Sequence, residues 1–515
     1  MGGRMWEALG GLRSDRLRWP LSLAAGIVLW ALSLPPYGLG VLAVLAFVPP
    51  LYTLPEEPLG RVAAWGWVGG TLWELATLWW LIPTLVRYGG IAEPVAVALI
   101  LAMCCVMGLY MAGFLWTMAL IVQRRGEHFL FAAPCVFVLW EWLRGHLFTG
   151  FPWWGPGYAL SLYPPLLQVT RIGGILSLSF LALLAAAALT LYLRDRRNPI
   201  NALLAPASVL LFGCALLWGW WFSGRPVSGE AKVPVGYLQP DVPQSEKWDP
   251  AFSGQIEQRL LDLASSFRHY GLKLMVWPES CTPFEWDGDE AYRAKVQEVA
   301  KATQAPILVG SLLKTNTGYQ NGAVLVMPDG AEGGRFAKTH LVPFGEYVPL
   351  RALLFFARPV VDIVTDLEPG DSLKPIESPA GKLGVTICYE GIFPELVRSQ
   401  VRMGAEILVN ITNDAWYRGT PGPAQHFLIE RVRAVETDRF LIRSANMGVS
   451  GVVNPRGRLE TTTSPGGPAA FWGLINARNT VTPWTVVGNI WLLLPLGVIV
   501  WFVRPVRRSP SKRPL

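Results

Sequence analysis

Residues 382–391, KLGVTICYEG, decide how the C-terminal half of this 515-residue chain folds. The apolar and β-branched run GVTI is typical of a buried strand, and Cys388 follows it where a helix is expected to begin. Two further stretches end in the same way: LKLMVWPES leads to Glu279, and GGRFAKTHLVPFGEY carries Lys338. We therefore expect three reactive side chains at the ends of strands, where a site can open.

The composition predicts an integral membrane protein. The chain is 52% hydrophobic and only 16% charged, and it contains 24 Trp, so it is too apolar for an ordinary soluble protein. We expect an α-helical transmembrane bundle of about eight spans, because stretches of the length that crosses a bilayer can be placed eight times. They lie near 20–35, 38–54, 62–86, 94–122, 129–146, 166–193, 201–222 and 486–503.

Arginine placement orients the bundle, because positive residues are retained on the cytoplasmic side. Clusters of Arg and Lys lie before the first span and after the fourth, sixth and eighth spans. With eight spans all four clusters fall on one side, and the first span is expected to stay uncleaved. We predict membrane helices in 1–224, a polar domain outside the cytoplasm in 225–485, and a last span with a basic tail in 486–515. The net charge of +7 then reflects topology and indicates no nucleic-acid partner.

The polar domain alternates β-branched runs with amphipathic stretches, which is the pattern of a layered α/β domain. Strands are expected at 232–238, 273–278, 306–311, 322–327, 383–387, 406–411, 440–445 and 449–453, and helices at 252–270, 289–303, 393–403 and 424–438. The turn MPDG precedes a returning strand that leads to Lys338. The sequence shows no metal-ligand cluster and no phosphate-binding glycine loop.

The three residue types suit acyl transfer. A cysteine accepts an acyl group as its thiolate, which requires a base or a positive charge nearby. Glu279 is the candidate base, and Lys338 is the candidate cation for the thiolate and for an oxyanion. The backbone N–H groups of Tyr389 and Glu390 follow the nucleophile and are candidate oxyanion donors. Each residue alone is usually structural, so the prediction depends on their combination.

Four segments, WPES, FAKTHLVPFGEY, ICYEGIFPE and NITNDAWY, resemble the carbon–nitrogen hydrolase (nitrilase) superfamily. With the flanking spans and the motif FTGFPWWGPGY at 148–158, nearly the whole chain resembles the apolipoprotein N-acyltransferase family. The resemblance implies an αββα sandwich that carries a general base, an oxyanion partner, a nucleophile and three supporting residues. In this sequence these are, in that order, Glu279, Lys338, Cys388 and then Glu346, Tyr389 and Glu390.

The resemblance also implies the reaction and its place in the cell. The acyl donor is a membrane phospholipid, and the acceptor is the α-amino group of a diacylglyceryl-cysteine on a bacterial apolipoprotein. The enzyme uses no cofactor or metal, is embedded in the lipids of the bacterial inner membrane, and has its catalytic domain on the periplasmic side. Two alternatives remain open from the residues: a membrane-tethered amidase that passes the acyl group to water, and a transport or scaffold protein with an inactive outer domain.

Residues 350–364, LRALLFFARPVVDIV, are unusually apolar for a segment between the candidate lysine and cysteine. We interpret them as a lid that dips into the membrane and admits acyl chains, although an ordinary core helix has the same pattern. Phe355, Phe356 and Trp416 are therefore candidates for the substrate entrance.

Several charged residues lie within or beside the spans, where an ionisable group is costly and often functional. Glu74 is either functional or a partner in a bond between helices. Glu141 and Arg144 are three apart and are expected to pair. An alternative is that Arg144, with Arg87 and Arg171, holds a phospholipid phosphate.

The remaining candidates are expected to be structural. Cys281 and Cys388 lie in the same domain, and we predict that they are unpaired because a disulfide would block the nucleophile. His340 and His426 are expected to be structural residues and not metal ligands. The tryptophans at 153–154 are expected to anchor the chain at the membrane interface.

Overall fold

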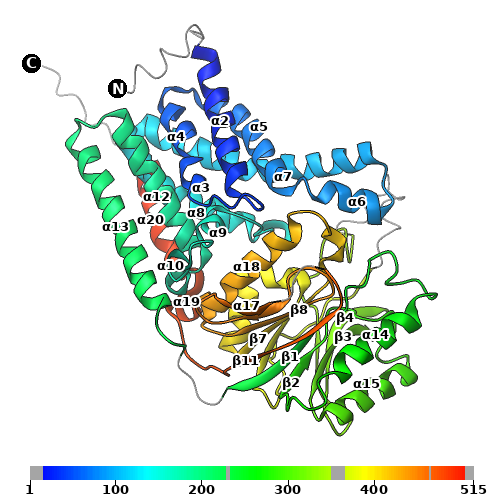
Figure 1. Ribbon diagram of the computed structural model, residues 1–515. Helices are drawn as coiled ribbons and strands as arrows, with labels where there is room; N and C mark the ends of the chain where they lie inside the picture. The colour runs from blue at the N-terminus through cyan, green and yellow to red at the C-terminus, as the bar shows by residue number, and fades with distance from the viewer. Residues whose placement is uncertain (1–14, 228–231, 349–365, 463–465, 505–515) are drawn as a thin grey trace, which may run out of the picture.

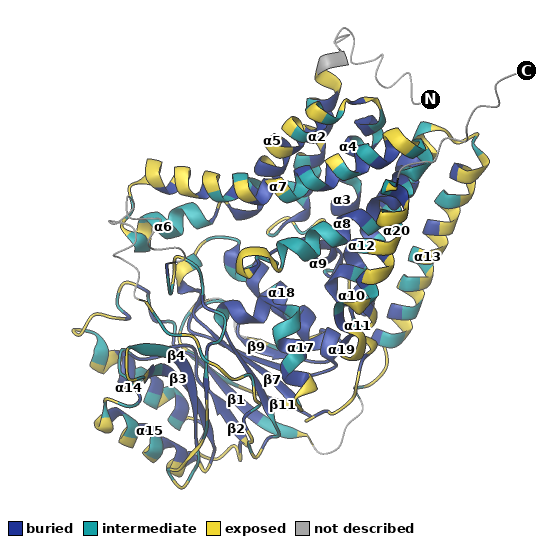
Figure 2. Cartoon of the chain, turned by 180° about the vertical axis from the view of Figure 1, so that it is seen from behind, coloured by how far each residue is buried: buried dark blue, intermediate teal, exposed yellow. Residues whose placement is uncertain are grey.

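The computed structural model describes residues 15–227, 232–348, 366–462 and 466–504. Figure 1 shows a layer of helices packed on an α/β domain that contains all the strands. In Figure 2 the long helices carry broad exposed faces, whereas the sheets are almost entirely buried. The exposed faces of these helices are apolar, with Leu210, Leu217 and Trp220 at 68 to 70% exposure, as expected of a surface that faces lipid.

The helical part is built from both ends of the chain. Its N-terminal helices are α2 (Asp15–Ser33), α3 (Leu42–Leu45), α4 (Val48–Thr53), α5 (Leu59–Leu78), α6 (Leu81–Gly89), α7 (Glu93–Arg125) and α8 (Ala133–Arg144). They continue as α9 (Pro156–Leu160), α10 (Pro164–Leu167), α11 (Thr170–Gly173), α12 (Ile175–Arg194) and α13 (Pro199–Ser223). The C-terminal end adds α19 (Pro483–Val487), the 3₁₀ turn η7 (Gly488–Leu492) and α20 (Leu493–Val503).

Four helical stretches are long and apolar enough to cross a membrane: Glu93–Arg125, Ile175–Arg194, Pro199–Ser223 and Pro483–Val503. Leu17–Ser33 and Leu42–Glu56 are shorter apolar helices. Two of the predicted spans, 62–86 and 38–54, are divided into shorter helices. Pro83 would place its ring against the carbonyl of Trp79, four residues before it, and the predicted span 62–86 divides there into α5 and α6. Pro49 has the same relation to Leu45, where α3 ends.

The α/β domain contains two sheets. The six-stranded sheet has the order β11-β1-β2-β3-β4-β5, and the five-stranded sheet has the order β10-β9-β8-β7-β6. The first six strands are β1 (Val233–Gln239), β2 (Leu274–Val276), β3 (Ile307–Lys314), β4 (Tyr319–Val326), β5 (Glu332–Ala337) and β6 (Leu383–Ile387). The others are β7 (Ile407–Thr412), β8 (Leu441–Ala445), β9 (Gly451–Val453), β10 (Leu459–Thr462) and β11 (Ala469–Ile475).

The sheets stack face to face, with helices on both outer faces. One core cluster joins residues of the two sheets, such as Val276 and Leu308 from one and Val385 and Val409 from the other. Helices α14 (Ser253–Ser265) and α15 (Glu290–Thr303) cover the six-stranded sheet, and α17 (Pro394–Arg402) and α18 (Gly422–Thr437) cover the five-stranded sheet. The predicted αββα sandwich is therefore confirmed.

All eight predicted strands and all four predicted helices are present. Three further strands lie outside the predicted ranges. β5 is the returning strand before Lys338, whereas β10 and β11 follow the last predicted strand. β11 closes the large sheet by pairing antiparallel with β1, with Gly473 opposite Val235. This pairing joins residues far apart in the chain, so no local sequence pattern predicts it.

The two parts share one hydrophobic core. Tyr389, Phe393 and Ile429 of the α/β domain belong to the same buried cluster as the helical residues Trp153 and Trp154. These tryptophans are only 5% and 1% exposed, so the prediction that they are interfacial anchors is wrong. They fill the junction because the loop 150–155 lies between the bundle and the α/β domain. The predicted lid, 350–364, lies outside the described residues.

Candidate active site

Cys388 lies where β6 ends and a short 3₁₀ helix, Cys388–Ile392, begins. Its φ of +50° is in the left-handed region, which non-glycine residues rarely adopt. Strained backbone of this kind is found where the surrounding structure fixes a functional side chain. The carbonyl oxygen of Cys388 accepts a bond from Asn410 Nδ2 at 3.3 Å, which helps to hold the turn.

Lys338 follows β5 and is almost fully buried, at 1% exposure. Its Nζ atom lies 2.8 Å from Oε1 of Glu346 and 3.9 Å from Oε1 of Glu279. Its backbone N–H donates to the carbonyl of Asn321 on β4 at 2.8 Å. The ammonium is thus fixed between two carboxylates, both predicted as site residues from the sequence.

Asn321 is a site residue that the sequence analysis missed. Its Nδ2 donates to Glu279 Oε1 at 2.7 Å and to Glu346 Oε1 at 3.1 Å. The amide therefore bridges the carboxylates that flank Lys338. The available signal was a single buried amide on the otherwise apolar strand QNGAVLV. An amide in a strand core usually has a specific partner.

The site electrostatics favour a protonated lysine and a neutral thiol at rest. Burial acts to lower the pKa of Lys338, but Glu346 and Glu279 outweigh it and raise that pKa above its usual value. Burial, followed by the charge of Glu279, raises the pKa of Cys388, while Lys338 partly opposes this shift. Cys388 therefore needs a base to remove its proton during attack.

Glu390 holds two loops together. Its Oε1 accepts bonds from Thr339 N at 2.7 Å, Thr339 Oγ1 at 2.8 Å and His340 N at 3.1 Å. Its Oε2 accepts a bond from Ile387 N at 2.8 Å. Burial raises the pKa of Glu390, although these donors and Lys338 favour the ionised form. The carboxylate thus ties the segment after Lys338 to the turn that carries Cys388.

Tyr389 faces the helical part. Its hydroxyl donates to the carbonyl of Gly150 at 3.4 Å. Its ring lies 6.4 Å from that of Phe151 and 5.0 Å from that of Phe393. The residue next to the nucleophile therefore packs against the loop between α8 and α9.

Behind the nucleophile lies a buried ionic network. His426 on α18 has its Nδ1 2.9 Å from Asp414 and its Nε2 2.9 Å from Glu430, and Nε2 also lies 3.3 Å from the carbonyl oxygen of Cys388. Arg443 contacts both carboxylates. Burial disfavours the imidazolium, but the two carboxylates outweigh it and raise the pKa of His426 to about 9. His426 therefore supports the nucleophile turn, in agreement with the structural role predicted for it.

Lys247 is a second buried cation that the sequence analysis missed. It is 3% exposed, and its Nζ donates to the backbone carbonyl of Glu279 at 3.2 Å. Burial lowers its pKa, while Glu279 acts in the opposite direction. Cys281 lies nearby with its Sγ 3.3 Å from the carbonyl of Gly310. Both Cys281 and Cys388 are free thiols in the structure.

Trp416, predicted at the entrance, is 38% exposed and lies beside α6. Its ring is 5.5 Å from that of Tyr88, and its carbonyl accepts a bond from Thr84 Oγ1 at 3.1 Å. Phe355 and Phe356 lie outside the described residues, so their entrance role stays a prediction.

His340 packs on Phe393 with ring centroids 3.9 Å apart. No group of three metal ligands occurs in the described ranges.

The ion pair of Arg144 is with Glu74 on another helix, at 3.1 Å, and not with Glu141 as expected. Its Nη2 also donates to the carbonyls of Trp153 and Trp154, at 2.7 and 3.0 Å. The carboxylate comes from α5, whereas Arg144 is the last residue of α8. Glu74 is thus a partner between helices, the second of its two predicted roles.

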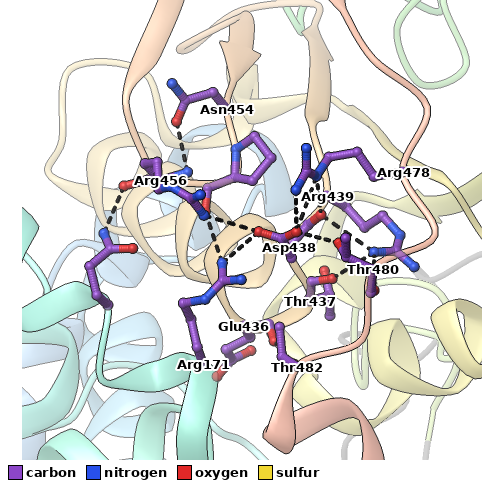
Figure 3. Close-up of polar contacts among 12 residues, drawn as sticks. Arg171, Glu436, Thr437, Asp438, Arg439, Asn454, Arg456, Arg478, Thr480 and Thr482 are labelled. Atoms are coloured by element: carbon purple, nitrogen blue, oxygen red, sulfur yellow. Dashed lines mark hydrogen bonds and ion pairs between the residues drawn. The ribbon is translucent and has the colours of Figure 1, made fainter. Parts of the chain in front are cut away.

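Arg171 is bound elsewhere. It pairs with Asp438 at 2.6 Å, and Figure 3 shows Arg456 and Arg478 meeting the same carboxylate. The three arginines Arg144, Arg87 and Arg171 contact different partners. The predicted phosphate-binding cluster is therefore not formed. Arg87 donates to the carbonyl of Arg418 at 3.4 Å. The Asp438 network instead joins α11 to the sandwich.

Comparison with known families divides the chain as the fold does. Residues 25–188 match the apolipoprotein N-acyltransferase N-terminal domain, and residues 243–467 match the carbon-nitrogen hydrolase family. The apolipoprotein N-acyltransferase of Geobacter metallireducens is 34% identical over 456 residues, which cover 86% of each chain. The Pseudomonas putida protein of the same name is 32% identical over 506 residues, covering 93% of this chain and 95% of its own.

Solved structures match about half of the chain. A nitrilase superfamily member from Saccharomyces cerevisiae aligns with a TM-score of 0.38 and 20% identity, covering 49% of this chain and 92% of its own. A carbon-nitrogen hydrolase from Helicobacter pylori gives a TM-score of 0.37 and 20% identity, covering 54% of this chain and 96% of its own. The family assignment rests on the sequence relatives, whose similarity extends through both the helical part and the sandwich. The chain belongs to the apolipoprotein N-acyltransferase family.

Proposed function

We propose that this protein transfers a fatty acyl group from a membrane phospholipid, through a thioester on Cys388, to the α-amino group of a diacylglyceryl-cysteine at the N-terminus of an apolipoprotein. The observation that carries the proposal is the buried cluster of charged side chains around Lys338. Glu279 and Glu346 flank its ammonium, beside the turn that carries Cys388. The names of the relatives support the acyltransfer reaction.

In the first half-reaction, Glu279 takes the thiol proton of Cys388 as sulfur attacks the ester carbonyl carbon. The carbonyl π electrons move to oxygen, and the charge of Lys338 stabilises the resulting oxyanion. When the carbonyl re-forms, the C–O bond to glycerol breaks, and Glu279 returns its proton to the departing alkoxide. The products are a lysophospholipid and a Cys388 thioester.

In the second half-reaction, the neutral α-amino group attacks the thioester carbonyl. Glu279 accepts a proton from the attacking nitrogen, Lys338 again stabilises the oxyanion, and the C–S bond breaks to give the amide. The thiolate of Cys388 then recovers the proton. Asn321 and Glu346 support both steps because they fix the charged groups, and fixed dipoles need no reorganisation as charge develops.

We further propose the full membrane arrangement for this chain. Eight spans, with the last in 486–515, would put the sandwich of 225–485 on the periplasmic side of the inner membrane and the helices of 1–224 in the lipid. Four apolar helices of spanning length support a multi-pass bundle. Phe355, Phe356 and Trp416 would then serve lipid entry. Transfer to water by an amidase is not favoured, because the relatives named N-acyltransferase match over most of the chain.

Intact-mass analysis after incubation with phospholipid tests the proposal. We expect an added acyl mass on the wild-type protein and none on Cys388→Ala. Glu279→Gln should form the adduct about 10² to 10⁴ times more slowly, because it lacks the base. Cys281→Ala is the matched control and should acylate normally, since its thiol faces a core carbonyl. An adduct on Cys388→Ala, or its loss in Cys281→Ala alone, would contradict the assignment.

A further inference from the structure

A lysine in the loop between β1 and α14 reaches the candidate base. Lys247 is only 3% exposed, and its Nζ donates to the main-chain carbonyl of Glu279 at 3.2 Å. Unlike Lys338, it forms no ion pair with any residue that the structure describes. Burying a cation is costly unless its surroundings compensate. The proposed reaction assigns no role to this lysine.

The loop that carries Lys247 is held by residues of the five-stranded sheet. The main chain of Val242 exchanges two hydrogen bonds with the side chain of Asn446, at 3.0 and 2.9 Å. Gln244 accepts a bond from Nδ2 of Asn413 at 2.8 Å, and Asn446 donates to Oδ1 of Asn413 at 2.9 Å. These two asparagines directly follow β7 and β8. Lys247 therefore extends from a fixed loop, as a residue that positions another one must.

Glu279 lies beyond the end of its strand, so its main chain depends on contacts outside the sheet. β2 ends at Val276. Ser280, the residue after the base, has a φ of +38°, in the left-handed region that non-glycine residues rarely adopt. A Cβ on Gly310 of β3 would lie 2.2 Å from the carbonyl oxygen of Pro278 and 2.9 Å from Cα of Glu279. The bend that carries the base is therefore packed directly against β3.

Two donors hold Glu279, one at each end of the residue. Asn321 donates to its carboxylate at 2.7 Å, and Lys247 donates to its main-chain carbonyl at 3.2 Å. Without the second contact, the main chain can turn and carry the carboxylate away from Cys388. Burial and then Glu279 raise the pKa of Cys388, so the thiol needs a base within hydrogen-bond reach. A displacement of about 1 Å can slow such a step by as much as 10²-fold.

We propose that Lys247 is a positioning residue for the general base, because its hydrogen bond to the main chain of Glu279 fixes the carboxylate relative to Cys388. It acts on the reaction through Glu279 and not by contact with the substrate. The inference rests on the proposed function in taking Glu279 as the base. A lysine that only supports the fold of its loop would have the same effect whichever side chain stands at position 279.

A double-mutant cycle separates these two roles. Acylation of the peptide that contains Cys388 is followed by mass after reaction with p-nitrophenyl butyrate, a soluble ester. Parallel reactions use dioleoyl phosphatidylglycerol in mixed micelles. Lys247→Met keeps the apolar stem but removes the donor, and we expect it to slow acylation by roughly tenfold. In the Glu279→Gln background the same substitution should slow acylation by less than about twofold, because the base that Lys247 positions is absent.

The dependence on ester concentration gives a second readout. In Lys247→Met the maximal acylation rate should fall, whereas the half-saturating ester concentration should stay within about twofold of the wild-type value. Lys295→Met is the matched control, because it removes the same charge from the same domain. The ion pair of Lys295 with Glu257 is 48% exposed on the lysine side. Its acylation rate should be within about twofold of wild type.

Melting temperatures are measured for every variant. Lys247→Gln, which keeps a polar group but is too short to reach the same carbonyl, is the second variant if Lys247→Met does not fold. Equal slowing in the two backgrounds would overturn the proposal, as would an unchanged rate in a folded variant or failure of both variants to fold.

The outcome for Lys247 is separate from that for the proposed acyl donor. Wild-type protein that is acylated by the soluble ester but not by the phospholipid would refute the proposed donor, while the cycle at Lys247 is still read with the ester. Acylation by the phospholipid, combined with equal slowing by Lys247→Met in both backgrounds, would instead refute the positioning role and leave the proposed function in place.

Discussion

Replacing Glu390 by Gln separates a positioning role from a chemical one. The side chain keeps its size, but one of its oxygens becomes an NH₂ group. The carbonyl oxygen of the amide can retain the three bonds that Thr339 and His340 donate to Oε1. The NH₂ group must then face the N–H of Ile387, which in the wild-type protein donates to Oε2 at 2.8 Å.

The cost follows from these contacts. One charge-assisted hydrogen bond is lost, worth about 1.5 to 3 kcal/mol, and a buried N–H is left unsatisfied at a cost of about 1 to 3 kcal/mol. The changes overlap, so we expect a loss of about 3 kcal/mol in the free energy of unfolding. For a domain of this size that lowers the melting temperature by roughly 6 to 12 °C. Acylation of Cys388 should be slowed by about tenfold, a loss of about 1.4 kcal/mol in the transition state.

Melting temperature and the rate of acyl-adduct formation are measured on the same preparations. Glu377→Gln is the control for stability, because its ion pair with Lys382 is 72% exposed on the glutamate side and should contribute little. Glu279→Gln is the control for chemistry. An unchanged melting temperature in Glu390→Gln, together with a rate as low as that of Glu279→Gln, would refute the positioning role and place Glu390 in the proton transfer.

Two further predictions concern residues behind the proposed triad. Asn321→Leu should reduce the acylation rate by about tenfold, about 1.4 kcal/mol, because the bridge between the carboxylates is lost; an unchanged rate in stopped-time mass analysis would contradict this. The pKa of His426 is raised to about 9, because Glu430 and Asp414 outweigh burial. The contribution of charged His426 to the free energy of unfolding is therefore complete below about pH 6.5. It is lost as the pH rises through 9, by up to about 3 kcal/mol. Melting temperatures should fall over this range in wild type but less in His426→Gln, and equal pH slopes would count against the assignment.

The sequence predicts the parts of this site that depend on local patterns. Apolar runs end just before Glu279 and Cys388 and form the buried strands β2 and β6, whereas Lys338 follows the mostly exposed strand β5. The helices predicted at 289–303 and 393–403 begin and end within one residue of α15 and α17. Local burial patterns suffice here because each element has one face against a sheet and the other against solvent or helices.

The site residues that the sequence does not reveal depend on contacts across the chain. Asn321 becomes a site residue only because β4 lies beside β5, which brings its amide to the carboxylates around Lys338. Lys247 lies in a loop and reaches the carbonyl of Glu279 through the pairing of β1 with β2. The spacing predicts a partner for Arg144 in its own helix, Glu141, whereas the bundle supplies Glu74. Spacing along the chain cannot rank a local partner against one on another helix.

Consecutive residues on α18 connect the membrane part to the nucleophile. Gln425 accepts bonds from the indole N–H groups of Trp153 and Trp80, at 2.8 and 3.2 Å, and both tryptophans belong to the helical part. The next residue, His426, stacks on Trp153 and lies 3.3 Å from the carbonyl oxygen of Cys388. A sandwich expressed without residues 1–224 would lose these partners and leave Gln425 exposed to water. The geometry of the nucleophile turn is therefore a property of the whole chain, and the membrane helices contribute to it directly.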